Sequence, residues 1–306
     1  MEAETAGDPI TGLKWTRRTT AKIAMELKTV DINVSQKTVA RLLKQLGFSL
    51  RVNHKKIART VNVSPLERDA QFSHIAELRE LCAARNVPVI SVDSKKKEII
   101  GNFKNAGQTW NRKPVAVNDH DFRSESDGIA TPFSIYDLKY NTGFVCVGTS
   151  HDTPQFAVES IARWWSRVGK RRYPNAQELV ILADAGGSNG PRCRMWKYEL
   201  YKRLCNHYGL TVTVSHYPSG ASKWNPVEHR LHSEISKNWA GQPLESLETI
   251  LNYINTTTTS TGLKVQASLV KKKYEKGVKI SNAKFYKIPI MYDNALPRWN
   301  YSLMPS

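Results

Sequence analysis

The sequence predicts an α/β fold with a mixed β-sheet, preceded by a small all-α domain. Three observations lead to this prediction: strongly basic helical periodicity near the N-terminus, short strand-like apolar runs from Val87 onward, and a later alternation of strands with helices. The 306 residues are 40% hydrophobic and 24% charged, which provides enough apolar chain for a substantial core. This composition excludes an intrinsically disordered chain.

The composition also excludes several classes of protein. The longest apolar run, Val87–Val92, has six residues, whereas a bilayer span needs about 18, so we expect no membrane segment. The first thirty residues hold acids and no apolar signal segment, and a cytoplasmic, nucleoid-associated protein is therefore expected. Without any C-x-x-C pair, a disulfide framework and the usual zinc knuckles are excluded, and a metal would be held by oxygen; the four cysteines are Cys82, Cys146, Cys193 and Cys205.

Positive charge is concentrated in two stretches of the chain. The formal net charge is +18, of which Lys14–Arg59 carries +10 and Lys264–Lys287 carries +7. A near-neutral middle is thus flanked by two basic segments. Solvated lysine-rich surfaces are the simpler interpretation, but this concentration favours contact with the phosphate backbone of a nucleic acid.

Two short helices are expected within the N-terminal domain, residues 1–59. Apolar residues recur at helical spacing in Thr19–Leu27 and Val34–Leu46, with Ser35 as an N-cap and Gly47 as a stop. In this basic context the pair predicts a helix-turn-helix that reads double-stranded DNA, and a protein-contacting helical hairpin is the alternative. The predicted DNA contacts are Arg17, Arg18, Ser35, Gln36, Lys37, Arg41, Lys44, Arg51, Lys55 and Lys56, with Lys271, Lys272 and Lys273 near the C-terminus.

The next segments are predicted to be a helical connector over 60–86 and then a catalytic core over 87–240. Pro65 begins the connector helix, which runs through Arg85. The core is expected to begin with a hairpin, followed by an irregular stretch and a third strand. These elements are Val87–Val92 and Glu98–Phe103 with Lys95-Lys96 at the turn, then 104–132, then Gly143–Gly148.

Strands and helices alternate in the second half of the core. The expected elements are a helix from Thr153 to Gly169, a strand over Glu178–Ala183, a helix over Pro191–Tyr208, a strand over Leu210–Ser215 and a helix over Pro226–Trp239. An antiparallel meander followed by this alternation is the element order of an RNase H-like fold. A helix over Leu244–Asn255 and strand-prone chain around Trp299–Leu303 belong to a basic C-terminal extension, 241–306, which is expected to pack on the core.

Three acids occupy chain positions that suit metal binding. Asp93 follows the first strand, Asp184 closes the buried strand, and Glu228 opens the late helix. In an RNase H-like sheet these ends converge at one edge, where clustered carboxylates bind Mg²⁺ or Mn²⁺ through oxygen. Two such ions about 4 Å apart activate a water or a 3′-hydroxyl and stabilise the leaving oxygen of a phosphodiester displacement. We therefore expect two ions and an enzyme that cuts and joins DNA.

Each acid also has a purely structural interpretation. Asp93 suits a turn, and the Gly-rich segment after Asp184 fits no standard nucleotide-binding loop. Asn225 and Glu228 are close to a capping box, which would stabilise the helix by roughly 1 kcal/mol without catalysis. His232, four residues after Glu228, shares its helix face and is expected to support it. Glu234 is rotated by about 240° from Glu228 and cannot reach the same site.

Several motifs give the sequence a family resemblance. The blocks are Ser91–Glu98, Ala183–Gly190 and Ser222–Arg230, with His120–Phe122, Phe133–Asp137, His151–Thr153 and Thr261–Val265. From about Gly12 to its end the sequence resembles the DDE transposases of bacterial insertion sequences, in particular the Rhodopirellula-type DDE-domain family, distantly related to mariner-like enzymes. This resemblance implies that Asp93, Asp184 and Glu228 form the catalytic metal-binding triad. It further implies strand transfer of a 3′-hydroxyl into target DNA, and a homodimer or larger assembly on terminal inverted repeats.

Two departures from the family pattern keep other functions open. Members of the family usually carry further DNA-binding chain upstream, so we expect a shortened copy. The 43 residues between Asp184 and Glu228 exceed the mariner-like spacing. One alternative is a truncated, catalytically silent DNA-binding regulator of transposition. The other is an RNase H-like nuclease without strand transfer, against which the helix-turn-helix argues.

Overall fold

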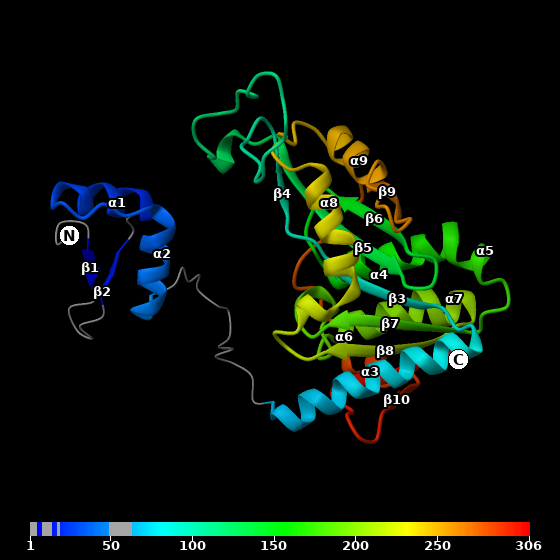
Figure 1. Ribbon diagram of the computed structural model, residues 1–306. Coiled ribbons are helices and arrows are strands. Elements are labelled where there is room, and N and C mark those ends of the chain that lie inside the picture. The colour runs from blue at the N-terminus through cyan, green and yellow to red at the C-terminus, as the bar shows by residue number, and fades with distance from the viewer. Residues whose placement is uncertain (1–4, 8–13, 17–18, 49–62) are drawn as a thin grey trace. The chain divides into compact units, whose positions relative to one another are not determined.

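The chain forms two units, 1–59 and 60–306, in the computed structural model. The structure describes residues 5–7, 14–16, 19–48 and 63–306 (Figure 1). Among these residues, no helix has the length and the apolar content that a membrane span requires.

The N-terminal unit contains the two predicted helices, α1 (Thr20–Thr29) and α2 (Gln36–Gln45). Both begin at a side-chain cap, because Thr19 Oγ1 accepts from the Lys22 amide and Ser35 Oγ accepts from the Thr38 amide, each at 3.2 Å. The helices contact one another. Two short antiparallel strands that the sequence did not predict complete the described part of this unit, β1 (Thr5–Gly7) and β2 (Lys14–Thr16).

A nine-stranded mixed sheet forms the centre of the larger unit, in the order β10-β11-β8-β7-β3-β5-β6-β9, with β4 paired to β5 (Figure 1). The strands are β3 (Val89–Ser94), β4 (Glu98–Ile100), β5 (Gly128–Asp137), β6 (Thr142–Gly148), β7 (Glu178–Asp184), β8 (Thr211–Tyr217), β9 (Lys264–Val270), β10 (Ile290–Tyr292) and β11 (Asn300–Leu303). Strands β3, β5 and β6 are antiparallel neighbours, whereas β7 and β8 run parallel to β3. The order β6-β5-β3-β7-β8 confirms the RNase H-like prediction. At the edges, β9 runs parallel to β6 and β11 runs antiparallel to β8.

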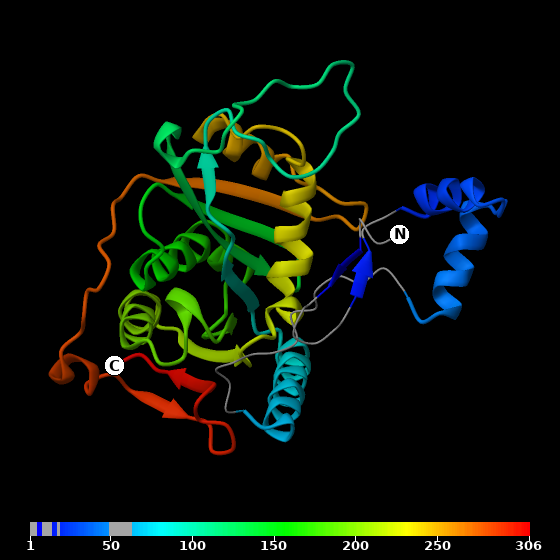
Figure 2. The ribbon, with the colours of Figure 1, turned by 90° about the vertical axis from the view of Figure 1, so that its left-hand side faces the viewer.

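Helices cover both faces of the sheet, which gives three layers (Figure 2). One face is covered by α4 (Pro154–Trp164), η3 (Trp165–Gly169) and the continuous helical stretch α6 (Arg194–Leu200), η5 (Tyr201–Cys205) and α7 (Asn206–Tyr208); α5 (Lys170–Arg172) follows η3. The other face is covered by α3 (Pro65–Arg85), η7 (Glu228–His232), α8 (Ser233–Asn238) and α9 (Leu247–Asn255). The remaining turns are η2 (Arg123–Glu125), η4 (Gly187–Asn189), η6 (Ser222–Trp224) and α10 (Asn282–Phe285).

Side chains of strand β7 point alternately to the two faces of the sheet, so they pack against both layers of helices. Leu179, Ile181 and Ala183 pack with α4 and α6, while Val180 and Leu182 pack with α3. All five side chains are buried. Because β7 is apolar on both faces, its place between β3 and β8 follows from its sequence.

The predicted hairpin between the first two strands is wrong. β4 does not turn back on β3 but continues in the same direction along β5, with Ser94 opposite Phe133 and Glu98 opposite Ala130. The register shifts by one residue across Lys95–Lys97, which therefore form a bulge rather than a turn. Asp93 thus lies within a long interrupted strand.

Strand β5 falls partly in the stretch that was predicted to be irregular, and it was missed because Pro132 interrupts its pattern. Pro132 lies opposite Val147 of β6, and its carbonyl accepts from the Lys95 amide at 3.0 Å. The nitrogen and the carbonyl of one strand residue point to the same side, so Pro132 directs its missing N–H toward the bulge. The proline lies where the ladder is already interrupted.

Candidate active site

Two of the three predicted acids lie on neighbouring strands. Val92 of β3 is paired with Ala183 of β7, so Asp93 and Asp184 occupy the next positions of two adjacent parallel strands. Val92 and Ala183 face the core beneath α4. Because side chains alternate, Asp93 and Asp184 project to the opposite face, the one covered by η7 and α8.

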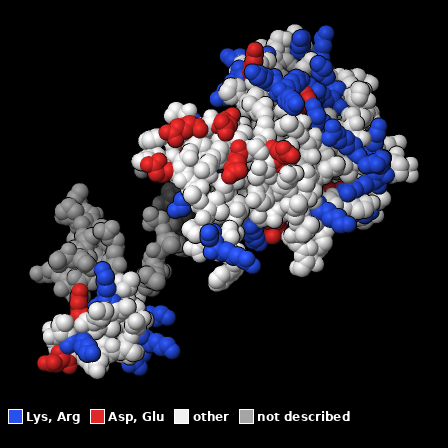
Figure 3. Space-filling view, turned by 90° about the horizontal axis from the view of Figure 1, so that it is seen from above, with Lys and Arg blue, Asp and Glu red and all other residues white. Residues whose placement is uncertain are grey.

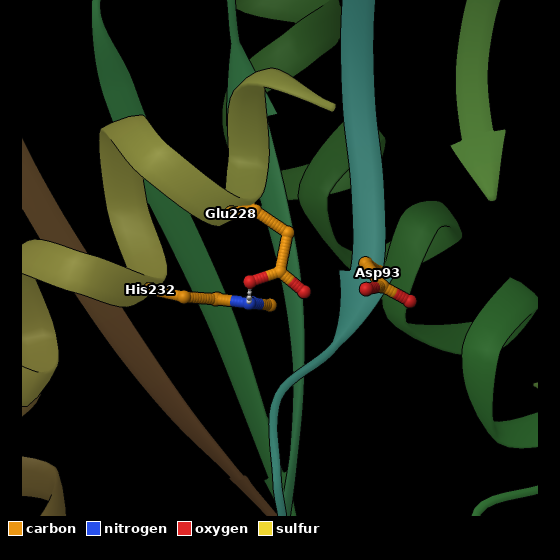
Figure 4. Close-up of side chains that lie close together, drawn as sticks. All are labelled: Asp93, Glu228 and His232. Carbon is orange, nitrogen blue, oxygen red and sulfur yellow. Dashed lines mark ion pairs between the residues drawn. The ribbon is translucent and has the colours of Figure 1, made fainter. Parts of the chain in front are cut away.

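Glu228 reaches Asp93 from that covering helix. One ligand atom from each of Asp93, Glu228 and His232 lies within 4.8 Å of the other two. Figure 4 shows Glu228 directed toward both neighbours, and His232 Nδ1 lies 3.5 Å from Glu228 Oε2. Both residues belong to the wide π-helical turn η7, whereas the sequence predicted an ordinary α-helix there. Glu234 lies outside the group and pairs with Lys237 at 2.6 Å.

Asn225 ties the three acid-bearing segments together, a role that the sequence did not reveal. Its fully buried side chain donates to Asp184 Oδ1 at 2.9 Å and to the Val92 carbonyl at 3.3 Å, and its Oδ1 accepts from Ser91 Oγ. Ser91 Oγ also accepts from the Val227 amide at 2.9 Å, which fixes the start of the helix that carries Glu228. The capping-box interpretation is therefore wrong, because this side chain holds Asp184 and makes no cap.

Replacement of Asn225 by Ala is expected to lower cleavage at saturating metal by roughly tenfold to a hundredfold, because the Asp184 carboxylate loses the donor that orients it. It should also lower the free energy of unfolding by about 1–3 kcal/mol, since buried hydrogen-bond partners are left unpaired. The Asn225 amide lowers the pKa of Asp184. The acidic limb of the cleavage–pH profile should therefore move to higher pH.

The matched control for this variant is Asn238→Ala. The Asn238 amide donates to the Tyr253 carbonyl at 2.6 Å and to the hydroxyls of Thr256 and Thr257, away from the acids. This control is expected to lose stability without a shift in the pH profile. Equal pH profiles for the two variants would show that Asn225 has only a structural role.

The electrostatics of the acids are those of buried carboxylates crowded together. Burial first, then the charge of Asp184 and the hydrogen bond with Glu228, raise the pKa of Asp93 to about 8. Burial raises the pKa of Asp184 to about 6, although the Asn225 amide opposes this rise. The hydrogen bond from His232 lowers the pKa of Glu228, while burial lowers the pKa of His232. These carboxylate oxygens, with one imidazole beside them, fit a divalent cation such as Mg²⁺ or Mn²⁺.

A buried lysine borders the site. Lys95 Nζ lies 2.6 Å from Glu98 Oε1 and 4.5 Å from the centre of the Trp239 ring, and its side chain is 8% exposed. Its charge lowers the pKa of Glu228. The turn predicted at Lys95-Lys96 is a bulge instead, in which Lys96 and Lys97 are exposed. Lys95 points inward only because of the bulge, so no signal in the sequence distinguished Lys95 from Lys96 and Lys97.

A buried histidine holds the end of β7 from the other side of Asp184. Burial lowers the pKa of His216 to about 4, so its ring is neutral near pH 7. Nδ1 donates to the Asp184 carbonyl at 3.0 Å, and Nε2 accepts from the Tyr301 hydroxyl at 3.1 Å. Trp196 Nε1 in turn donates to that hydroxyl at 3.0 Å. The backbone beside Asp184 is thus fixed through β8 and β11.

The predicted DNA contacts are distributed over both units. Gln36, Lys37, Arg41 and Lys44 are exposed on α2, whereas the Ser35 hydroxyl is engaged as the N-cap. Lys271–Lys273 are exposed, and Lys272 Nζ pairs with Glu159 Oε2 at 3.0 Å. Figure 3 shows one face of the larger unit, on which Lys and Arg form a band apart from a group of Asp and Glu. Five further predicted contacts lie outside the described residues, Arg17, Arg18, Arg51, Lys55 and Lys56.

Comparisons with known proteins give one family match and several structural ones. The family model for the Rhodopirellula transposase DDE domain matches residues 1–305. A Mos1 transposase paired-end complex with the left transposon end is similar at a TM-score of 0.47 and 14% identity, over 77% of this chain and 65% of that chain. The Mos1 strand transfer complex gives a TM-score of 0.45 and 13% identity, over 81% and 71%. The chain thus spans less than two thirds of the first of these structures. A search of curated proteins found no match.

Proposed function

The chain belongs to the Rhodopirellula transposase DDE domain family, and on that premise we propose that it cleaves DNA at the ends of an insertion sequence and joins the freed 3′-hydroxyl to target DNA. One observation carries this proposal. Asp93 and Asp184 occupy neighbouring positions on two adjacent strands, and Glu228 and His232 of a distant helix bring ligand atoms within 4.8 Å of Asp93. Each carboxylate alone has a structural explanation, but the raised pKa values of Asp93 and Asp184 mean that their ionised forms cost the fold stability.

Asp93, Asp184 and Glu228 would hold the divalent ions, Mg²⁺ or Mn²⁺, of which two are expected. When bound, such ions activate the attacking oxygen and stabilise the leaving oxygen of a phosphodiester displacement. His232 keeps Glu228 ionised through their contact at 3.5 Å. Asn225 keeps one Asp184 oxygen engaged at 2.9 Å, which orients the other.

Contacts with DNA would come from both units. The exposed polar side chains of α2 would read the terminal inverted repeat, and exposed lysines would bind phosphates. Trp224, which directly precedes Asn225 in the chain, is 45% exposed, with Lys223 Nζ 4.0 Å and the Arg68 guanidinium 5.6 Å from its ring centre. An exposed aromatic ring between two cations suits a nucleic-acid base that stacks beside its phosphate. We further propose a homodimer or larger assembly on paired ends, acting at the nucleoid in the cytoplasm.

The test is a labelled DNA duplex that carries the terminal repeat of the encoding element, incubated with the protein and Mg²⁺, Mn²⁺ or EDTA. We expect nicking at the repeat end and joined products with either metal, and neither product in EDTA, because the acids need a cation to act together. Cleavage without joined products would identify a nuclease instead. Salt-sensitive binding without cleavage under any divalent metal would identify a silent regulator of transposition.

A further inference from the structure

A groove of about 890 Å³ opens directly beside Asp184, on the side of β7 away from Asp93. Its walls come from the loop that follows β7, from the start of α6, and from the chain that enters β11. The residues that matter for the argument are Gly186, Gly187, Arg192, Lys197 and Arg298. All these segments lie at the edge of the sheet that carries the acids.

Positive charge in this groove lacks matching negative charge. Lys197 is only 7% exposed, and its Nζ lies 4.4 Å from the Tyr301 ring centre and 3.3 Å from the Tyr292 hydroxyl. No carboxylate pairs with Lys197 or with Arg192 in the part of the chain that the structure describes. Arg298 has a loose pair with Glu67 at 3.5 Å, in which both side chains are more than 40% exposed. Burial lowers the pKa of Lys197. A buried ammonium without a counterion is costly, and an anion would relieve that cost.

Neutral donors in the same loop also lack partners. Ser188 Oγ and Asn189 Nδ2 are buried without a hydrogen bond among the described residues. At Gly186, a Cβ atom would meet no other atom within 4 Å, so the main chain there is open. Neither the Ser188 nor the Asn189 side chain lines the groove, to which this loop contributes Gly186, Gly187 and Gly190; the groove therefore combines open backbone with the cations Arg192, Lys197 and Arg298. These groups suit a tetrahedral oxyanion.

We propose that this groove binds a backbone phosphate of the same DNA strand that is cut at the acids, with Lys197 as the central contact and Arg192 and Arg298 at the rim. This inference rests on the proposed function. Neighbouring strands are about 4.8 Å apart, so the groove beyond β7 lies roughly 10 Å from Asp93. Because successive phosphates of one strand are separated by the helical rotation as well as by the 3.4 Å rise along the axis, that distance corresponds to about one or two nucleotides. The site would set the register of the strand by holding a phosphate away from the one that is attacked.

The test compares Lys197→Met with Lys202→Met, which removes an exposed charge from the same helical stretch outside the groove. Titration with inorganic phosphate is followed by calorimetry, without DNA. Wild type and Lys202→Met should bind phosphate equally, and Lys197→Met at least tenfold more weakly. Lys197→Met should also melt no lower than wild type, since it removes a buried unpaired charge.

A second measurement replaces single phosphates of the terminal-repeat duplex with neutral methylphosphonates. One position about one or two nucleotides from the cleaved bond should weaken binding at least fivefold in wild type and in Lys202→Met, and should have no effect in Lys197→Met. Identical methylphosphonate profiles, or equal phosphate binding by the two variants, would overturn the proposal. If DNA is cleaved but the methylphosphonate profiles are identical, only the proposed phosphate site in the groove is wrong. If phosphate binding depends on Lys197 but no metal supports cleavage, only the proposed function is wrong.

Discussion

Replacement of Asp184 by Asn is expected to lower metal-dependent cleavage by at least about a thousandfold, because the lost carboxylate contributes several kcal/mol of charge stabilisation in the transition state. The substitution keeps the shape of the site. An amide oxygen can still accept the bond from Asn225, and the His216 contact uses the main-chain carbonyl of Asp184. DNA affinity should therefore stay within about twofold of wild type.

The measurement is the rate of nicking on the labelled terminal-repeat duplex under single-turnover conditions, with binding measured on the same duplex. Glu234→Gln is the matched control. The Glu234 carboxylate belongs to the same helical segment as Glu228, but it pairs with Lys237 and lies outside the acid group. This control should cleave at the wild-type rate. Residual cleavage by Asp184→Asn above a tenth of the wild-type rate would contradict the assignment of this acid.

The second large effect is a gain in stability. Asp93→Asn is expected to raise the free energy of unfolding of the metal-free protein at alkaline pH. Asp93 has a pKa of about 8 in the folded chain, against about 3.9 for an unfolded aspartate. The folded state therefore binds more protons between these values, and this residue costs stability progressively as pH rises from about 4 to about 8. Above pH 8 the full cost is present. The variant removes it and still offers an oxygen to the Ser94 amide.

We expect Asp93→Asn to melt on the order of 5 °C above wild type at pH 8.5 in EDTA, and at the wild-type temperature at pH 4. Melting curves across this pH range provide the measurement. Excess Mn²⁺ should raise the melting temperature of wild type and leave that of the variant nearly unchanged, because ligand binding stabilises only a site that can form. A variant that melts below wild type at pH 8.5 would show that Asp93 stabilises the fold.

Much of the architecture follows from local sequence signals. Ser35 caps its helix as predicted, and Thr19, Ser64 and Thr153 also cap helices, a role typical of their side chains; Ser64 forms a full capping box with Glu67. The buried strand that ends at Asp184 is recognisable from its continuous apolar run. These features depend on neighbours in the chain, which is why the sequence alone reveals them.

The features that could not be predicted depend on partners far apart in the chain. Pro132 excludes a central strand unless a bulge lies opposite, and the bulge at Lys95–Lys97 becomes visible only once β4 is known to pair with β5. Asn225 resembles a cap in sequence because Pro226 follows it. Its true partners, Ser91 and Asp184, are 134 and 41 residues away. The acids were identifiable as strand and helix ends, whereas the groups that orient them were not.

The contact between His216 and Tyr301 makes β11 part of the site's assembly. Tyr301 follows Glu228 by 73 residues in the sequence, on a strand that pairs with β8. During translation, Asp93, Asp184 and Glu228 are therefore synthesised before the strand that fixes the backbone beside Asp184. This edge of the sheet can be completed only after β11 has been synthesised. A stop codon just upstream of Tyr301 would leave all three acids encoded and yet disable the enzyme.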